Sequence, residues 1–256
     1  MSHCSFVSNG WSFYFLLTVL VGFVAPLQVI AESAERLILS EDFEGGLDLW
    51  RVEDRGGHHL VELSDGRLIV RNLVPTPGVF VWSRVELPAS FRLEFDFCPL
   101  GRGKQQKGFY LLFFGALAQD GRSILEDEVW HSEPLQDFRK YTRGDIRCYH
   151  IGYLRGQTGL CNLRKNPGLN LVQSNEVPVL AEGETYRVVV EKRGGSIKMS
   201  VSGPGIEGEQ GIFQDWVDLA VDSPVLDGGA FAFRQIAYDE GVAGVYDNVR
   251  LVALGP

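Results

Sequence analysis

The sequence is poor in basic residues and has none of the glycine patterns that bind phosphate. Its 24 Lys and Arg residues are outnumbered by 33 Asp and Glu residues, which gives a formal net charge of −9. Binding to nucleic acid needs broad positive potential, so the composition argues against a nucleic acid as the general partner. The glycines form no phosphate-loop pattern, and this argues against a nucleotide ligand.

The sequence also lacks heptad runs, low-complexity tracts and internal repeats. What it has is an ordinary globular composition, with 45% hydrophobic and 22% charged residues among 256. A sandwich or barrel of this length can be one domain, so the length alone does not require two.

The first thirty residues differ in kind from the rest. Trp11–Val24 is almost wholly apolar, and Val29 and Ala31 supply the small residues that precede a cleavage site. This pattern predicts a signal peptide over residues 1–31 and a single mature domain over residues 32–256, in a secreted or periplasmic protein. The residues before the apolar segment include no Lys or Arg, which fits this interpretation poorly.

An uncleaved membrane anchor is the alternative for the same segment. Trp11–Ile30 is just long enough to span a bilayer. Pro26 and Gln28 interrupt that span, so we favour cleavage, which implies no stable insertion into a membrane.

Export changes how the cysteines are interpreted. Cys4 precedes the apolar segment, and the mature chain would keep Cys98, Cys148 and Cys161, an odd number for an oxidising compartment. Cys148 and Cys161 flank a predicted hairpin turn and could lie near each other. The favoured alternative is three buried thiols that act as small apolar residues, and the sequence leaves both open.

Strand patterns recur along the mature chain and are separated by Gly, Pro, Asn and Asp turns. The predicted strands and hairpins cover residues 60–72, 78–87, 90–97, 108–117, 147–155, 160–165, 185–203, 228–238 and 244–254. The only helix candidate, residues 123–138, is short, acidic and interrupted by Pro134. Many strands with little helix predict an all-β fold, a jelly-roll β-sandwich of two antiparallel sheets.

The order of these segments resembles the concanavalin A-like lectin/glucanase superfamily. The resemblance rests on EDFEGGLDLWRVE (41–53), DGRL (65–68), WSRVELPASFRLEFDF (82–97), GGSIKMSVSG (194–203) and GVYDNVRLV (244–252). Within it, YHIGYLRG (149–156) and CNLRKNPG (161–168) are similar to the YesU-like family of bacterial pectin and rhamnogalacturonan utilisation proteins. The resemblance covers about residues 36–254 and implies an exported protein that binds or degrades carbohydrate.

Positive charge is concentrated around the central hairpin. Between residues 139 and 165, one acid, Asp145, stands against seven basic residues: Arg139, Lys140, Arg143, Arg147, Arg155, Arg164 and Lys165. The rest of the chain carries −15, because this segment contributes +6 to the total of −9. The segment is either a solvated hairpin or a site for an anionic ligand, and the charge contrast favours an anionic polysaccharide or oligosaccharide over a neutral one.

Side chains alternate along a strand, so parity sorts the hairpin into two faces. We expect Cys148, His150, Gly152 and Leu154 to face the core with Cys161 and Leu163. The outward, concave-facing surface would then hold Arg147, Tyr149, Tyr153, Arg155, Asn162 and Arg164. Tyr rings stack on sugars, while Arg, Asn and the neighbouring Lys165 bind hydroxyls or carboxylates. The alternative is a solvated face with cross-strand pairing between Tyr and Arg.

Two histidines and one tryptophan are further candidates. Parity places His150 in the core, and a bulge at Gly152 would turn it outward. In EDEVWHSE (126–133), Trp130 could stack on a sugar while His131 acts as acid or base. The alternative is a solvated surface helix that Trp130 anchors.

Glu94 and Asp96 are the candidate hydrolytic pair. Residues at i and i+2 of a strand lie roughly 6.5–7 Å apart at Cα, within the range that could flank a glycosidic bond. Hydrolases of the resembled superfamily often carry Glu-x-Asp-x-x-Glu on one strand, and Pro99 replaces the third acid here, which puts this mechanism in doubt. The alternative is a sheet face on which both acids pair with Arg92.

Three functions therefore stay open. A uronate lyase would use Arg155, Arg164 and Asn162 to neutralise the carboxylate, with Tyr149, Tyr153, His150 or His131 to move the proton. A glycoside hydrolase would use Glu94 and Asp96, and a lectin-like module would need no chemistry. No cofactor is expected except a structural calcium ion, for which the candidate ligands are Glu41, Asp42, Glu44 and Asp247.

Overall fold

The structure is a computed structural model that describes residues 35–54, 57–73, 76–101, 108–126, 139–155, 159–220, 223–237 and 241–255. The predicted signal peptide lies outside these residues. Within the described ranges, no helix has the length and apolar character needed to cross a membrane.

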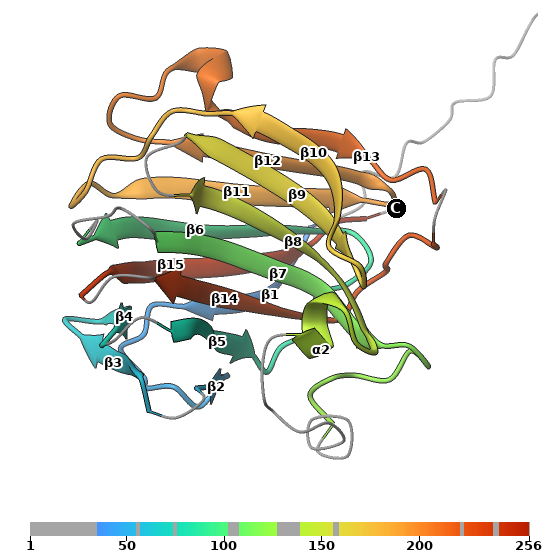
Figure 1. Cartoon of the computed structure of the whole chain (residues 1–256), viewed down its shortest axis with the longest axis horizontal. Coiled ribbons are helices and arrows are strands. Elements are labelled where there is room, and N and C mark those ends of the chain that lie inside the picture. Colours follow the sequence, from blue (N-terminus) through green and yellow to red (C-terminus); the bar gives the residue numbers. More distant parts are fainter. Residues whose placement is uncertain are drawn as a thin grey trace, which may run out of the picture. The chain divides into compact units, whose positions relative to one another are not determined.

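The described residues form two antiparallel sheets, which confirms the predicted fold class (Figure 1). In one sheet of eight strands the order is β13-β12-β11-β6-β15-β4-β3, with β1 paired to β15. Its strands are β1 Arg36–Glu41, β3 His59–Ser64, β4 Arg67–Asn72, β6 Phe91–Leu100, β11 Tyr186–Arg193, β12 Ser196–Ser202, β13 Ile212–Val217 and β15 Ala243–Ala253.

The second sheet has seven strands in the order β10-β9-β8-β7-β14-β5-β2. Its strands are β2 Trp50–Glu53, β5 Thr76–Ser83, β7 Gly108–Ala118, β8 Ile146–Arg155, β9 Leu160–Asn166, β10 Asn170–Glu176 and β14 Ala230–Ala237. Figure 1 shows β9, β8, β7 and β14 side by side in this sheet, with the short helix α2 (Arg139–Thr142) beside the end of β7 and β8.

Regular alternation explains the strands of the eight-stranded sheet. In β6, buried and half-buried residues alternate along all ten positions, so that Phe91, Phe95 and Phe97 face inward while Glu94 and Asp96 face outward. A strand with one apolar face is stable only when that face is covered by another layer.

The main core lies between the two sheets and is rich in aromatic rings. Phe233 of β14 stacks on Tyr246 of β15 with ring centroids 4.2 Å apart, and Phe95 of β6 packs edge-on against Phe233 at 4.9 Å. Such pairs add to the free energy that burial alone provides. These contacts hold the sheets together and fix which faces point outward.

A second apolar cluster covers part of the outer face of the seven-stranded sheet, meaning the face directed away from the eight-stranded sheet. Phe80, Trp82 and Phe113 lie there under Tyr141 of α2. Glu53 accepts hydrogen bonds from Trp82 Nε1 and Tyr141 OH, and Lys140 Nζ lies 3.0 Å from its carboxylate. This sheet is therefore apolar on both faces.

The helix candidate at 123–138 is only partly described. Ser123 forms an isolated β-bridge with Leu117, and residues 124–126 form a turn and a bend rather than a helix. Residues 127–138 lie outside the described ranges, and α2 occupies the four residues that follow.

Cys98, Cys148 and Cys161 are unpaired thiols, so the favoured alternative to a Cys148–Cys161 disulfide is confirmed, except that Cys98 is only half-buried. Cys148 belongs to the cluster on the outer face and Cys161 to the core between the sheets, so the two sulfurs lie on opposite sides of the sheet. Burial raises the pKa of each of these two thiols to about 12.

Candidate functional site

The prediction that Tyr149 and Tyr153 line an outward surface is wrong. Both tyrosines and Ile151 between them are fully buried in the core between the sheets. Cys148, His150 and Gly152 instead face outward from the seven-stranded sheet. Alternation along β8 gave the wrong assignment of faces because this strand lies inside a sheet that is apolar on both sides. Either set of its side chains is therefore compatible with burial between the sheets.

The buried tyrosines serve the core. Tyr153 OH donates a hydrogen bond to Tyr246 OH at 3.4 Å, and Tyr149 OH donates one to Asp218. Burial raises the pKa of both phenols above the ordinary value of 10.0. Neither phenol can therefore take a proton from a ligand on the outer face of this sheet, because both lie in the core between the sheets.

Lys165 is also buried, contrary to its predicted role in carbohydrate binding. Its Nζ lies 2.6 Å from Asp218 Oδ2 and donates a hydrogen bond to Ser223 O at 2.7 Å. Its charge is thus used within the protein.

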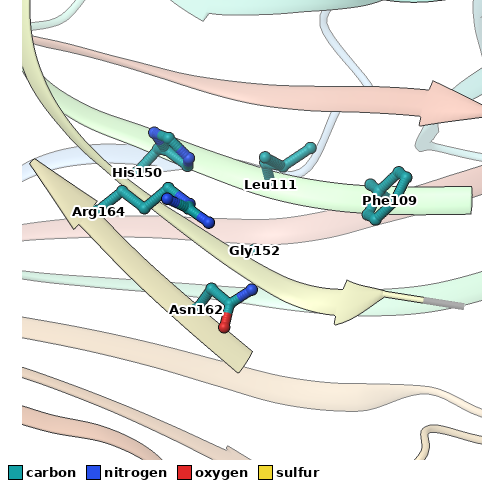
Figure 2. Close-up of a pocket in the computed structure, with 6 residues that line it drawn as sticks. All are labelled: Phe109, Leu111, His150, Gly152, Asn162 and Arg164. Atoms are coloured by element: carbon teal, nitrogen blue, oxygen red, sulfur yellow. The ribbon is translucent and has the colours of Figure 1, made fainter. Parts of the chain in front are cut away.

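A pocket of about 160 Å³ opens on the outer face of the seven-stranded sheet. Its lining comes from three neighbouring strands: Phe109 and Leu111 of β7, His150 and Gly152 of β8, and Asn162 and Arg164 of β9 (Figure 2). The strand register puts His150 opposite Arg164, and Gly152 opposite both Asn162 and Leu111. The expectation that Asn162 and Arg164 face outward is confirmed.

Gly152 creates the hollow of the pocket because it has no side chain. The nearest atom to a Cβ placed at this position is Leu111 Cδ2, at 4.0 Å. The backbone angle φ of Gly152 lies outside the left-handed region that favours glycine. Neither the backbone nor the packing around it therefore requires glycine. The missing side chain makes room between Leu111 and Asn162.

The polar side chains of the pocket are held by their neighbours. Arg164 donates a hydrogen bond to Leu169 O, and Asn162 Oδ1 accepts one from Ser174 Oγ at 2.6 Å. His150 stacks on Phe113 with ring centroids 4.8 Å apart, and its Nδ1 lies 2.8 Å from Asn166 Nδ2. These contacts fix three polar groups around one hollow.

The ring of His150 is neutral near pH 7. Burial, together with the positive charges of Arg234 and Arg164, lowers the pKa of His150 to about 3. The parity prediction was right that His150 is buried, with 5% of its surface exposed, but wrong about which face of the sheet it occupies. Of the lining residues that the structure describes, none is acidic.

This pKa predicts how stability depends on pH. The folded pKa of His150 lies below its ordinary value of 6.5, so the unfolded chain binds the proton more tightly. The contribution of His150 to the free energy of unfolding is complete above pH 6.5 and is lost as the pH falls from there toward 3. We expect the free energy of unfolding, measured with urea, to be about 1 kcal/mol lower at pH 5.5 than at pH 7 because of this group.

The control for the pH experiment separates His150 from the other histidines. His150→Gln should remove this part of the pH dependence, while His58→Gln, at an exposed position, should keep it. Identical slopes for the wild type and His150→Gln would contradict the assignment.

Of the remaining basic and aromatic candidates, only Arg147 has a described side chain, and it is not among the residues that line the pocket. Arg147 is half-buried, with its NH2 group 3.5 Å from Ala118 O. Arg155 ends β8 opposite Phe109, but its side chain is outside what the structure describes, as are Trp130 and His131.

Glu94 and Asp96 lie on the other sheet, in an ion-pair network. Arg187 contacts Glu94 at 2.8 Å and Asp96 at 3.0 Å, and Arg92 contacts Glu94 at 2.8 Å. Burial by itself would raise the pKa of Glu94, but hydrogen bonds from Arg187 and Arg92 hold it below the ordinary value. The alternative interpretation, in which these acids pair on a sheet face, is confirmed, although Arg92 pairs with Glu94 alone and Asp96 pairs with Arg187. Neither acid is among the residues that line the pocket.

The calcium ligands remain a prediction. Glu41 accepts hydrogen bonds from Phe43 N and Trp50 Nε1, and Asp42 accepts one from Glu44 N. Among the described residues, no group of three or more His, Cys, Asp or Glu side chains is arranged to hold a metal ion.

Sequence reasoning missed Phe109, Leu111 and Asn166 and undervalued Gly152. The one signal that could have found the pocket is Gly152, because an isolated glycine inside a strand marks a bulge or a place where something approaches the backbone closely.

The two antiparallel sheets define the class of the fold, which is a jelly-roll β-sandwich. A sequence model described as "Domain of unknown function (DUF1961)" matches residues 37–250. The chain belongs to this family. No curated protein matches the chain.

Solved structures with the same fold include proteins of different activities. One is a protein of unknown function with a galectin-like fold from Bacillus subtilis, with a TM-score of 0.72 and 22% identity, over 86% of this chain and 98% of that one. Another is the winged bean acidic lectin in complex with methyl-α-D-galactose, with a TM-score of 0.59 and 10% identity, over 87% of this chain and 100% of that one. A third is a prokaryotic β-1,3-1,4-glucanase derived from a mouse hindgut metagenome, with a TM-score of 0.54 and 13% identity, over 84% of this chain and 98% of that one.

Proposed function

We propose that this chain is an exported carbohydrate-binding protein whose outer-face pocket binds a sugar that carries a carboxylate. The observation that carries the proposal is the pocket itself, in which Arg164 and Asn162 lie beside an apolar wall and no described lining residue is acidic. The fold supports a carbohydrate ligand, because a lectin bound to methyl-α-D-galactose and a β-glucanase share it.

The residue types suit a uronate ring. Phe109 and Leu111 offer an apolar surface to the C–H face of a sugar, as aromatic side chains commonly do. The guanidinium of Arg164 has the planar geometry that matches a carboxylate with two parallel hydrogen bonds. The resemblance of the central hairpin to the YesU-like family makes fragments of pectin and rhamnogalacturonan the first ligands to test.

Binding is favoured over catalysis by the groups that the pocket lacks. Tyr149 and Tyr153 are in the core, and Glu94 and Asp96 belong to the other sheet. A lyase needs a proton acceptor at the sugar, and a hydrolase of the usual type needs two carboxyl groups. None of the described lining residues is a carboxylate or a tyrosine, and His150, whose pKa is lowered to about 3 by burial, is a poor proton acceptor near pH 7.

The test is titration calorimetry of the purified protein with oligogalacturonides, rhamnogalacturonan fragments and neutral galactan oligosaccharides. We expect the acidic sugars to bind and the neutral ones to bind weakly or not at all. In parallel assays, neither ultraviolet absorbance from unsaturated products nor new reducing ends should develop. Either product signal would show that the protein cleaves the glycan, which would contradict a function in binding alone. Preference for the neutral sugars would refute a ligand that carries a carboxylate.

The matched variants are Arg164→Ala in the pocket and Arg67→Ala on the other sheet. Arg67 is exposed and lies 3.6 Å from Asp65, so its removal costs one surface charge without touching the pocket. Hydrogen bonds to charged groups contribute about 1.5–3 kcal/mol, so Arg164→Ala should weaken oligogalacturonide binding by about 10- to 100-fold. Equal effects of the two variants would mean that the site lies elsewhere.

A further inference from the structure

A chain of hydrogen bonds lies behind His150, on the side away from the pocket. Cys148 Sγ–H donates to Tyr141 O at 3.3 Å, and Asn166 Nδ2–H donates to Cys148 Sγ at 3.4 Å. The same amide nitrogen lies 2.8 Å from His150 Nδ1. All four residues are buried, with Tyr141, Cys148 and Asn166 no more than 2% exposed.

The number of protons on each group decides which group donates in each of these hydrogen bonds. A thiol has one proton, and that of Cys148 is used on Tyr141 O, so the sulfur must accept from Asn166. The amide NH2 group supplies this bond and has a second proton for His150 Nδ1.

The reversed amide would be worse. It would place the amide oxygen, an acceptor, 3.4 Å from Cys148 Sγ, whose single proton is used on Tyr141 O. The contact between the amide and the sulfur would then contain no proton and would no longer be a hydrogen bond. His150 Nδ1 therefore carries a lone pair that accepts from Asn166.

A neutral imidazole has one proton, and the hydrogen bond at one nitrogen decides which nitrogen carries it. With Nδ1 accepting, the proton of His150 is on Nε2. One face of the ring is covered by Phe113 and Nδ1 is covered by Asn166. Among the described residues none bonds to Nε2, so its N–H is available to a ligand in the pocket that His150 lines.

We propose that Asn166, held in place by Cys148, is a positioning residue that keeps His150 as an Nε2–H donor, so that the described lining presents three side-chain donors to its ligand. The other two donors are Arg164 and the Nδ2 group of Asn162, one lone pair of whose Oδ1 accepts from Ser174. An ionised carboxylate only accepts hydrogen bonds, whereas a hydroxyl also needs an acceptor for its proton. As a statement about the ligand this rests on the proposed carbohydrate function, but the tautomer of His150 does not.

The first experiment therefore uses no ligand. Long-range ¹H–¹⁵N correlation spectra of the full-length protein with ¹⁵N-labelled histidine report which ring nitrogen is protonated, and the His150→Gln variant identifies the His150 signals. We expect a protonated Nε2 and a bare Nδ1, unchanged between pH 8 and pH 5. A protonated Nδ1, or a ring that gains a second proton in this range, would overturn the proposal.

The second experiment changes the group behind the ring. Asn166→Asp replaces the N–H donor with a carboxylate that accepts, so the proton should move to Nδ1 and leave Nε2 without one, or the ring should become doubly protonated. The spectrum should report either change directly. If Nε2 loses its proton, binding of oligogalacturonides should weaken by at least about tenfold, as for the loss of a hydrogen bond to a charged group.

Asn170→Asp is the matched control. Asn170 is exposed, is the first residue of β10 and donates to Pro167 O at 3.2 Å. It adds the same charge nearby without touching His150, so it should change neither the tautomer nor the binding by more than about threefold. An unchanged His150 spectrum in Asn166→Asp would refute the role of Asn166.

The two proposals can fail separately. The expected tautomer in a protein that binds none of the glycans would refute the proposed function and leave the role of Asn166 intact. Tight oligogalacturonide binding with a protonated Nδ1 would do the opposite. If Asn166→Asp does not fold, the spectrum of the unmodified protein still decides the tautomer.

Discussion

Gly152→Val should abolish measurable binding of oligogalacturonides while the protein remains as stable as the wild type. A Cβ at this position meets only Leu111 Cδ2, at 4.0 Å, so a side chain fits the protein and projects into the pocket that Gly152 lines. There it would take the place of the ligand. In a close-fitting pocket each added methylene group changes binding by roughly 10- to 200-fold, so two or more such groups should raise the Kd by more than about 100-fold.

Gly152→Ala gives the graded version of this experiment. It should weaken binding by about tenfold, while the free energy of unfolding stays the same or rises by about 0.4–1 kcal/mol, because alanine restricts the unfolded chain. Calorimetric titration measures the first quantity and urea unfolding the second. Few substitutions lower affinity and raise stability together, so this pair of results would identify a glycine whose role is to leave space.

Gly45→Val is the control for the same substitution away from the pocket. Gly45 lies on the exposed connection between β1 and β2, where a Cβ atom would meet no other atom within 4 Å and φ is not left-handed. The variant should bind like the wild type. Normal binding by Gly152→Val would mean that the ligand does not enter this pocket.

The fold could be predicted from the sequence because most strands have one apolar face. In β6, Phe91, Leu93, Phe95 and Phe97 alternate with polar residues, and every one of these phenylalanines and the leucine is in the core. On β9 the same rule succeeded, because Cys161 and Leu163 alternate with Asn162 and Arg164. Where polar and apolar residues alternate, only one assignment of faces avoids burying charge without a partner.

The site could be predicted only in part because β8 does not follow that rule. Its two faces carry Tyr149, Ile151 and Tyr153 on one side and Cys148, His150 and Gly152 on the other, and neither set is clearly polar. The cover over the outer face comes from Tyr141, which is distant from β5 and β7 in sequence, so no local pattern reveals it. The polar ends of the tyrosines suggested exposure, whereas their rings fill the space between the sheets and their hydroxyls find partners there.

Lys165→Ala should destabilise the protein by about 3–5 kcal/mol, although its neighbour Arg164 can be removed at little cost in stability. Lys165 and Asp218 have side chains that are only 7% and 4% exposed, and their charged atoms are 2.6 Å apart. Removing one partner of a buried pair leaves the other charge without compensation, and this is far more costly than losing the pair as a whole. Tyr149, which donates to the same carboxylate, would not neutralise it.

A double-mutant cycle tests this explanation. Lys165→Met keeps the apolar stem and removes the charge, Asp218→Asn removes the opposite charge, and the double variant removes both. We expect each single variant to lose several kcal/mol in urea unfolding and the double variant to recover much of the loss, because a pair replaced by uncharged groups of similar size is often nearly neutral.

Ligand binding separates the structural role of Lys165 from a role in recognition. At a temperature where Lys165→Met is folded, its affinity for oligogalacturonides should match that of the wild type, since Lys165 points into the core side of β9 and Arg164 into the pocket. A stable Lys165→Met protein that no longer binds would reverse the assignment. If the affinities match, two adjacent basic residues of one strand differ in role as alternation requires: Lys165 contributes to the free energy of unfolding, and Arg164 contributes to the affinity for the ligand.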